Sequence, residues 1–294
     1  MDGLIATSPL ATLTACVQGW RYLAFALLVA SYIGGISRRR SFFGWSAALV
    51  GVQVYTALLN AITAPFVQYL SFVICLGVIV GVIRVKQVVA VAAIVLIAWP
   101  AMFELRNEVR EANGIDVSAD VTATSRLRFD TFLTEASWYD VPVALEHAGL
   151  REIVRYGLIP RVLDPERPRL STGMEINAFR GGAENTSYSF LALGTVYFFE
   201  GDTGVALFYT GWTLFASLLI WIRGAPGPLR LCMLSLVIAE PLSWISMYPE
   251  SMIMVLQYAV AAVPVFVVLH ATARSTRPGG ESDRTEITAG REKC

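Results

Sequence analysis

A run of arginines interleaved with prolines is the feature of this sequence best suited to chemistry. Five arginines fall within 26 residues, and three of them flank prolines in the stretch LIPRVLDPERPR at positions 158–169. Guanidinium groups bind phosphate oxygens bidentately and stay charged at physiological pH, so at a membrane surface the cluster would suit a lipid-linked pyrophosphate. Alternatively, Asp164 and Glu166 pair with these arginines in an exposed loop, where each ion pair contributes about 0–1 kcal/mol. The five are Arg155, Arg161, Arg167, Arg169 and Arg180.

Four ionisable residues are candidates for proton transfer. Glu175 and Glu184 follow the proline-rich stretch, and each could accept a hydroxyl proton. Glu240 lies within an apolar run, where an uncompensated charge is costly and usually faces a polar cavity. His147 could also act as a general base, although a single histidine on an amphipathic helix is more often structural. The residue types alone leave the general base open.

Further arginines and tyrosines could bind the rest of a ligand. Arg126 and Arg128 precede the cluster and could face the same cavity, be solvated or contact lipid head groups. Tyr188 and Tyr197 belong to an aromatic series that could stack on sugar rings. An aromatic belt at a membrane interface explains the same series.

Apolar runs on both sides of these residues indicate a polytopic membrane protein. The chain has 294 residues, 55% of them hydrophobic, and its apolar runs are long enough to cross a bilayer as helices. We predict an all-α fold of about seven transmembrane helices, with one large extracytoplasmic loop that contains amphipathic helices. The predicted spans are residues 17–36, 42–63, 66–83, 87–103, 204–222, 230–248 and 251–270.

The placement of basic residues predicts how these spans are oriented. Arg38, Arg39 and Arg40 and the other short basic connections fall on one side under a single assignment, which the positive-inside rule makes cytoplasmic. The N-terminus is then outside and the C-terminus cytoplasmic. The four parts of the chain are a transmembrane part (1–103), the extracytoplasmic loop (104–203), a second transmembrane part (204–270) and a disordered tail (271–294).

The loop itself has several predicted segments. Residues 126–138 and 141–158 show apolar residues at helical spacing, as amphipathic helices do. Prolines at positions 160, 165 and 168 follow these segments, and the chain must be extended or turned there because prolines forbid regular structure. Residues 186–200 are apolar but too short to cross a bilayer, and Gly201–Asp202 separates them from the next span. This pattern predicts a re-entrant or interfacial segment.

Cysteines and histidines give no sign of a metal site. The four cysteines form no CxxC pair, and the two histidines lie far apart. We expect no metal, no cofactor and no nucleic-acid partner.

Two stretches of the loop carry a further signal, LIPRVLDPERPRLSTG and ENTSYSFLALGTVYFFEGDTGVALFYTG. They resemble the O-antigen polymerase (Wzy-like) group, the oligosaccharide repeat unit polymerases. That group typically has I-P-R-x-x-W-P-x-K-P in an extracytoplasmic loop, then an apolar segment containing T-S, then a G-x-x-G-V-type start of the next span. The similarity covers roughly residues 126–219, about a third of the chain.

The resemblance implies a reaction and its site. It implies polymerisation of undecaprenyl-pyrophosphate-linked oligosaccharide repeat units by glycosyl transfer, on the outer face of the bacterial cytoplasmic membrane. The implied partners are the lipid-linked oligosaccharide, membrane lipids, a flippase and a chain-length regulator. Arg161 matches the arginine after I-P, and Arg167 stands where the group often has lysine. We therefore expect Arg161, Arg167 and Arg169 to bind the pyrophosphate and stabilise its departure.

The sequence also departs from the pattern of this group. The frequent G-E-x-Y reads GTVY at positions 194–197, so Thr195 replaces the glutamate. Leu163 and Asp164 replace the aromatic residue before the first matching proline, and seven spans are fewer than the ten or more usual in the group. The missing glutamate favours a non-catalytic accessory subunit, and a transporter of a polysaccharide export system is a further alternative. A ligase-type glycan transferase also stays open, because it shares the same donor chemistry.

Overall fold

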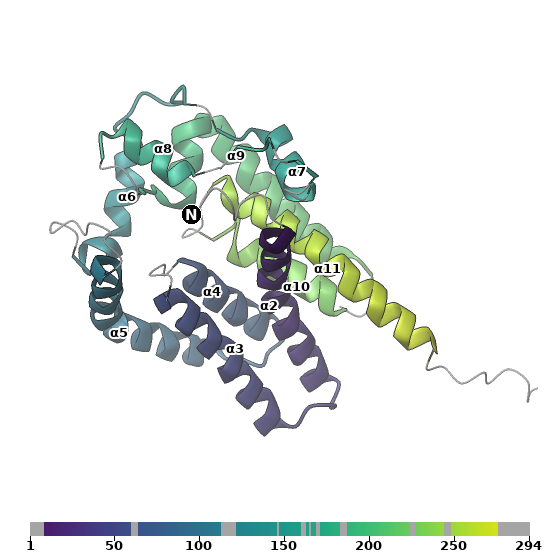
Figure 1. The fold of residues 1–294 in the computed structure, drawn as a ribbon. Coiled ribbons are helices and arrows are strands. Elements are labelled where there is room, and N and C mark those ends of the chain that lie inside the picture. Colours follow the sequence, from purple (N-terminus) through teal and green to yellow (C-terminus); the bar gives the residue numbers. More distant parts are fainter. Residues whose placement is uncertain are drawn as a thin grey trace, which may run out of the picture.

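Helices make up all the regular structure of the residues that the computed structural model describes. They are ten α-helices and one short 3-10 helix, with no strand among the described residues (Figure 1). The predicted all-α class is confirmed. The described residues are 9–59, 64–112, 122–145, 147–159, 163–164, 166–168, 171–182, 187–223, 227–243 and 248–275.

Long helices at the two ends of the chain enclose a series of short ones. The N-terminal helices are α2 (Pro9–Ile33), α3 (Arg39–Leu59), α4 (Ala64–Ile79) and α5 (Val85–Ala112). The short elements are η1 (Ser125–Leu127), α6 (Phe129–Ala136), α7 (Leu150–Leu158) and α8 (Thr172–Phe179). The C-terminal helices are α9 (Leu191–Trp221), α10 (Pro228–Ala239) and α11 (Glu250–Ser275).

Each of the seven predicted spans falls on a helix, but the helices differ in their ability to cross a bilayer. By length and composition, α3, α5, α9 and α11 are long and apolar enough to do so. The apolar helices Gly19–Ile33, Pro65–Ile79 and Pro228–Ala239 are shorter than 18 residues. The described residues therefore contain four candidate membrane-spanning helices, and the count of seven crossings stays a prediction.

The sixth predicted span, residues 230–248, is helical only as far as Ala239. Glu240 has φ −106° and ψ −85°, outside the helical region, and Pro241 follows it. Proline has no amide proton to donate and disfavours the helical conformation of the residue before it, so α10 ends at this pair. The predicted length of this helix is wrong for that reason.

The long helices other than α5 pack into a bundle with a core rich in aromatic rings. α2 packs against α3, α4, α10 and α11, and α10 also packs against α4. Tyr22 and Phe72 meet edge to face with ring centroids 4.9 Å apart, and Tyr69 lies beside them with no exposed surface. Aromatic side chains bury large areas and favour this geometry, so the three rings hold α2 against α4.

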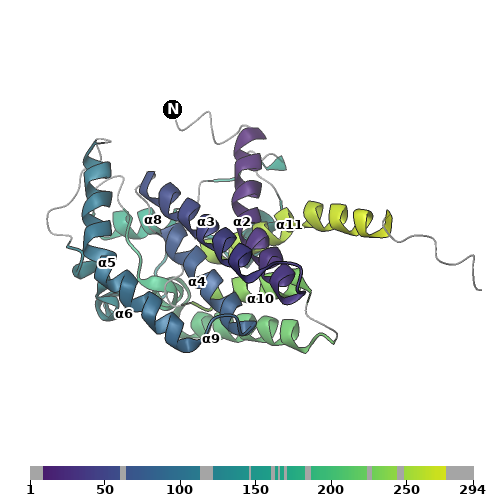
Figure 2. The same ribbon diagram turned by 90° about the horizontal axis from the view of Figure 1, so that it is seen from below.

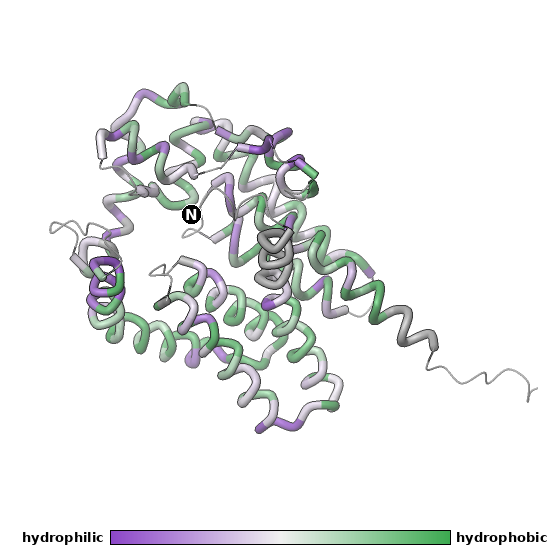
Figure 3. The backbone as a smooth tube through the Cα atoms, viewed as in Figure 1, coloured by the Kyte–Doolittle hydropathy of each residue, from purple (hydrophilic) through white to green (hydrophobic). Residues whose placement is uncertain are grey.

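Among the four candidate spans, α5 is the least buried within the protein. It packs against α3, and Figures 1 and 2 show it standing apart from α10 and α11. Ile94 and Ile97 are 64% and 81% exposed. Figure 3 shows apolar residues along most of α5 and polar residues toward its C-terminal end. An apolar surface that runs along most of a helix is suited to contact with lipid tails.

The short elements form a cap at one end of the bundle, which we define as the described residues between 122 and 200 (Figure 1). α6 packs against α9, and α7 packs against α11. Phe190, Phe198 and Ile176 are fully buried in the core of the cap. The same core includes Phe208 of α9 and Ile253 of α11, so the cap is continuous with the C-terminal helices.

The cap is less regular than its sequence predicts. The predicted amphipathic segment 126–138 contains η1 and α6, but the segment 141–158 is helical only from Leu150 onward. Pro142 has no amide proton, and Val143 N donates to Phe198 O of α9 at a distance of 2.9 Å. This contact holds the chain against α9 in place of the predicted helical turns. The sequence patterns also did not predict α8.

α9 joins the predicted interfacial segment to the following span through a kink. Gly201 has φ 66° and ψ −166°, a conformation that is essentially restricted to glycine. The predicted break at Gly201–Asp202 is thus a kink within one helix of 31 residues. Residues before the kink, such as Phe198, pack in the cap, and residues after it, such as Ala216, pack in the bundle core.

Candidate functional site

The N-terminal end of α11 brings together segments that carry several candidate residues. Glu250, the first residue of α11, accepts a hydrogen bond of 2.8 Å from Thr172 N at the start of α8. Gln257, two turns further on, donates to Tyr156 O of α7 at 3.0 Å. Tyr248, just before α11, donates to Glu200 of α9 at 2.8 Å. α7, α8 and the α9 kink are therefore neighbours in space although they are distant in the sequence.

Glu200, directly before the kink of α9, is held by two donors. Its Oε1 lies 2.9 Å from Nε2 of His147 and 2.8 Å from the hydroxyl of Tyr248. The other ring nitrogen of His147 lies 3.1 Å from Leu145 O. The imidazole also packs on Phe199, with ring centroids 4.6 Å apart. Two segments that are distant in the sequence thus fix one carboxylate of α9.

The hydrogen-bond partners of His147 define what this ring can do. A backbone carbonyl and a carboxylate both accept hydrogen bonds, so each ring nitrogen of His147 faces an acceptor. A ring held by both nitrogens in this way orients Glu200. The Glu200 side chain is 35% exposed, and its Oε2 has no hydrogen-bond partner among the described residues. This oxygen is therefore the one placed to accept a hydrogen bond from a ligand.

Two arginines of the predicted cluster are anchored at α7. Arg167 donates through Nη1 to Tyr156 O at 2.7 Å, and its guanidinium carbon lies 4.4 Å from the centroid of the Tyr156 ring. Arg155 forms an ion pair of 2.5 Å with the buried Asp164, whose carboxylate raises the pKa of Arg155. Pairing within the loop, one of the two predicted alternatives, therefore occurs for Arg155.

Arg180, at the C-terminal end of α8, belongs to a half-buried cluster between α6, α8 and the start of α9. Its Nη2 lies 3.2 Å from Oε2 of Glu135, and its guanidinium carbon lies 3.6 Å from the Tyr188 ring centroid. The Tyr188 hydroxyl donates to the same Oε2 of Glu135. Burial first, and then this carboxylate, raise the pKa of Tyr188. The tyrosine predicted to stack on a sugar thus stacks on an arginine of its own chain.

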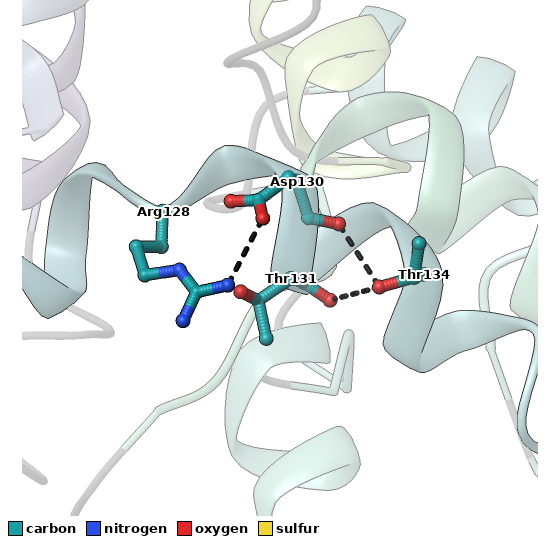
Figure 4. A network of polar contacts seen from close by, with 4 residues as sticks. All are labelled: Arg128, Asp130, Thr131 and Thr134. Atoms are coloured by element: carbon teal, nitrogen blue, oxygen red, sulfur yellow. Dashed lines mark hydrogen bonds and ion pairs between the residues drawn. The ribbon is translucent and has the colours of Figure 1, made fainter.

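Arg128 lies in an exposed polar network at the start of α6 (Figure 4). Its Nη2 is 3.1 Å from Asp130 Oδ2, and the two side chains are 67% and 69% exposed. The Thr134 hydroxyl donates to the backbone oxygens of Asp130 and Thr131. Arg126 is in η1, and only its backbone is described.

The remaining candidates are spread over the molecule. Glu175, in the first turn of α8, is half-buried, and Tyr197 of α9 packs at the edge of the cap core. Glu240 is fully buried, and neither of its carboxylate oxygens has a hydrogen-bond partner among the described residues. No three His, Cys, Asp or Glu side chains of the described part gather closely enough to hold a metal ion. Arg161, Arg169 and Glu184 lie outside the described residues.

Sequence reasoning did not single out Glu200 or Tyr248. Glu200 follows the run VYFF and directly precedes the predicted break at Gly201, so an acid at a helix break was the available signal. Tyr248 gave none, because it is one of several aromatic residues near a predicted turn. The pairing of His147 with an acid 53 positions away depends on how the cap folds back onto α9.

The fold and the site define an all-helical protein with four candidate membrane-spanning helices among the described residues. Its cap holds arginines and a fixed carboxylate near the start of α11. Comparisons of the chain with protein-family models, with curated proteins and with solved structures found no match. The chemistry of the site residues is therefore the basis for a function.

Proposed function

We propose that the protein is a membrane glycosyltransferase that lengthens an undecaprenyl-pyrophosphate-linked oligosaccharide on the outer face of the bacterial cytoplasmic membrane. One observation carries this proposal: the Glu200 carboxylate is fixed by Tyr248, just before α11, while Arg167 is fixed on α7, which packs on the same helix. Glycosyl transfer from a pyrophosphate to a hydroxyl needs cations for the leaving group and a base for the hydroxyl.

The arginines bind the leaving group in this proposal. Arg161, Arg167 and Arg169 would hold the pyrophosphate of the donor, as the sequence predicts. Arg155 and Arg180 form ion pairs with Asp164 and Glu135 and are not assigned to the ligand. The assignment of Arg167 rests on its fixed position at Tyr156 of α7. As the bond between the anomeric carbon and the pyrophosphate oxygen breaks, its electron pair stays on that oxygen, and guanidinium groups stabilise the added negative charge.

Glu200 activates the acceptor. A hydroxyl of the acceptor sugar attacks the anomeric carbon, and its proton passes to Oε2 of Glu200, because Oε1 is already engaged by His147 and Tyr248. His147 and Tyr248 act as positioning residues, since their contacts keep the carboxylate ionised and oriented. Glu200 would thereby supply the carboxylate that is absent at Thr195, which is buried in the cap with 1% of its surface exposed.

Glycan chain length in a reconstituted system tests the proposal. The full-length protein is placed in liposomes with a lipid-linked oligosaccharide, and the products are separated by size. We expect Arg161→Gln and Glu200→Gln each to lower the rate of chain lengthening by about 100-fold or more, since a general base contributes roughly 10²–10⁴. Glu104→Gln, the same change at an exposed position of α5, is the control.

Three outcomes would contradict the proposal. Unchanged chain lengths in both variants would exclude these residues from the reaction. No lengthening by the wild-type protein alone, with lengthening restored by other proteins, would favour an accessory subunit. Accumulation of finished polymer on the lipid carrier in a deletion strain, instead of single repeat units, would favour a ligase-type transferase.

A further inference from the structure

A second group of cations lies at the other end of the bundle, away from the cap. The connection between α2 and α3 and the connection between α4 and α5 meet there around a pocket of about 520 Å³. Its lining includes Arg39, Arg84 and Lys86, together with Gln87 and the rings of Tyr32 and Phe43. Figure 1 shows the α2–α3 connection on the far side of the bundle from α7 and α8.

Within the described part of the chain, these cations have no acidic partner. None of Arg39, Arg84 and Lys86 forms an ion pair with a described residue. The sequence contains no Asp or Glu between positions 3 and 103, and the first acid of α5, Glu104, lies 17 residues beyond Gln87 along that helix. The guanidinium of Arg39 instead lies 5.7 Å from the Phe43 ring centroid.

The ends of two helices add to the positive potential. α3 begins at Arg39 and α5 begins at Val85, both at the pocket, and neither helix has an acidic residue in its first turn. A helix N-terminus carries partial positive charge and is normally complemented by an acid, so basic residues there are unfavourable without an anion. Three side-chain charges and two helix ends therefore face one pocket that the protein does not neutralise.

The surroundings of the pocket fit a lipid more closely than a soluble anion. α3 and α5, which start at its rim, are candidate membrane-spanning helices. Ile36, Trp45 and Val85 beside it are 83%, 63% and 71% exposed, as suits side chains in contact with a membrane. Basic pockets between transmembrane helices bind anionic lipid head groups.

We propose that the pocket formed by Arg39, Arg84 and Lys86 binds the phosphate head group of an anionic phospholipid. The rings of Tyr32 and Phe43 also line the pocket and supply part of its apolar surface. The site is separate from the proposed glycosyl-transfer site and does not depend on that function.

Binding of a short-chain phosphatidylglycerol to the full-length protein in a zwitterionic detergent tests this site. We expect saturable binding, and a dissociation constant roughly 100-fold weaker in the variant Arg39→Gln/Arg84→Gln/Lys86→Gln, because each cation near an anionic group contributes about fivefold. Arg38→Gln/Arg40→Gln is the matched control: it changes neighbouring arginines that do not line the pocket, and it should bind as the wild type does.

Gln87→Glu is a second variant that does not depend on removing three residues. Arg84 N donates to Gln87 Oε1 at 2.7 Å, and a glutamate can accept the same hydrogen bond while adding one negative charge to the pocket. We expect its affinity for phosphatidylglycerol to fall about fivefold or more. Equal loss in the control variant, or equal binding of short-chain phosphatidylcholine, would overturn the site. Equal competition by inorganic phosphate would overturn the assignment to a lipid.

Discussion

The cap and the opposite end of the bundle both carry arginines, but these arginines differ in whether acids lie beside them. In the cap, Arg128, Arg155 and Arg180 each lie within 3.2 Å of an acid of the same chain. At the other end, Arg39 and Arg84 have no acid nearby in the described structure or in the surrounding sequence. The charge of a paired arginine is already neutralised by the protein, whereas the cations of a cluster without acids repel one another until an anion binds. The number of arginines is therefore a poor guide to where a ligand binds.

The largest effect of breaking a pair is expected at Glu135, whose carboxylate serves both Arg180 and Tyr188. Both side chains of the ion pair are mostly buried, with 26% and 13% exposed. We expect Glu135→Gln to lower the free energy of unfolding by about 1–3 kcal/mol, the cost of an impaired charged hydrogen bond in a partly buried site. Denaturant unfolding in detergent measures it. A change no larger than that of Glu104→Gln would show that this pair does not hold the cap.

A smaller effect of opposite sign is expected at the pocket. Gln87→Glu adds the acid that Arg84 and Lys86 lack, so in delipidated protein it should raise the free energy of unfolding by up to about 1 kcal/mol. The gain should shrink as phosphatidylglycerol is added, because the lipid supplies the same neutralisation. An increase in the free energy of unfolding that phosphatidylglycerol does not change would show that the lipid does not neutralise these cations.

The smallest effect is expected at Arg128. Its partner Asp130 is as exposed as Arg128 itself, and solvent screens such a pair. The arginine lowers the pKa of Asp130, so any stabilisation is present above the ordinary aspartate pKa and is lost as pH falls through the lowered value. We expect Arg128→Gln to leave the unfolding temperature unchanged at pH 7. If Arg128→Gln destabilised the protein as much as Glu135→Gln does, solvent exposure would not explain the difference in stability expected between the two ion pairs.

The long helices were predictable because a bilayer-length apolar run has few alternatives to a helix. The helical parts of residues 17–36, 42–63 and 66–83 follow their apolar runs closely. The early end of α10 was not predicted, because hydropathy does not register that Pro241 prevents the helix from continuing past Glu240. The end of α10 is thus set by the backbone properties of one proline, although the apolar composition of the run continues past it.

The candidate site was less predictable, because its contacts join residues that are distant in the sequence. Residue types directed attention to the stretch around Arg155 and Arg167, but they did not predict the contacts that each arginine makes. Asp164 pairs with Arg155, nine positions before it, and Arg167 turns to a backbone oxygen of α7. The His147–Glu200 contact accompanies the pairing of Val143 with α9, which the predicted helix over residues 141–158 had excluded.

The kink at Gly201 sets the rotational phase of α9. Each residue turns an α-helix by about 100°, so the face that any side chain presents depends on the number of residues between it and the nearest fixed point. Gly201 is such a fixed point, since a side chain there would force the backbone out of its φ of 66°. The faces that side chains present before Gly201 and after it are therefore set independently of each other. Insertions after Gly201 alter which residues meet the bundle, while Glu200 keeps its orientation toward His147 and Tyr248.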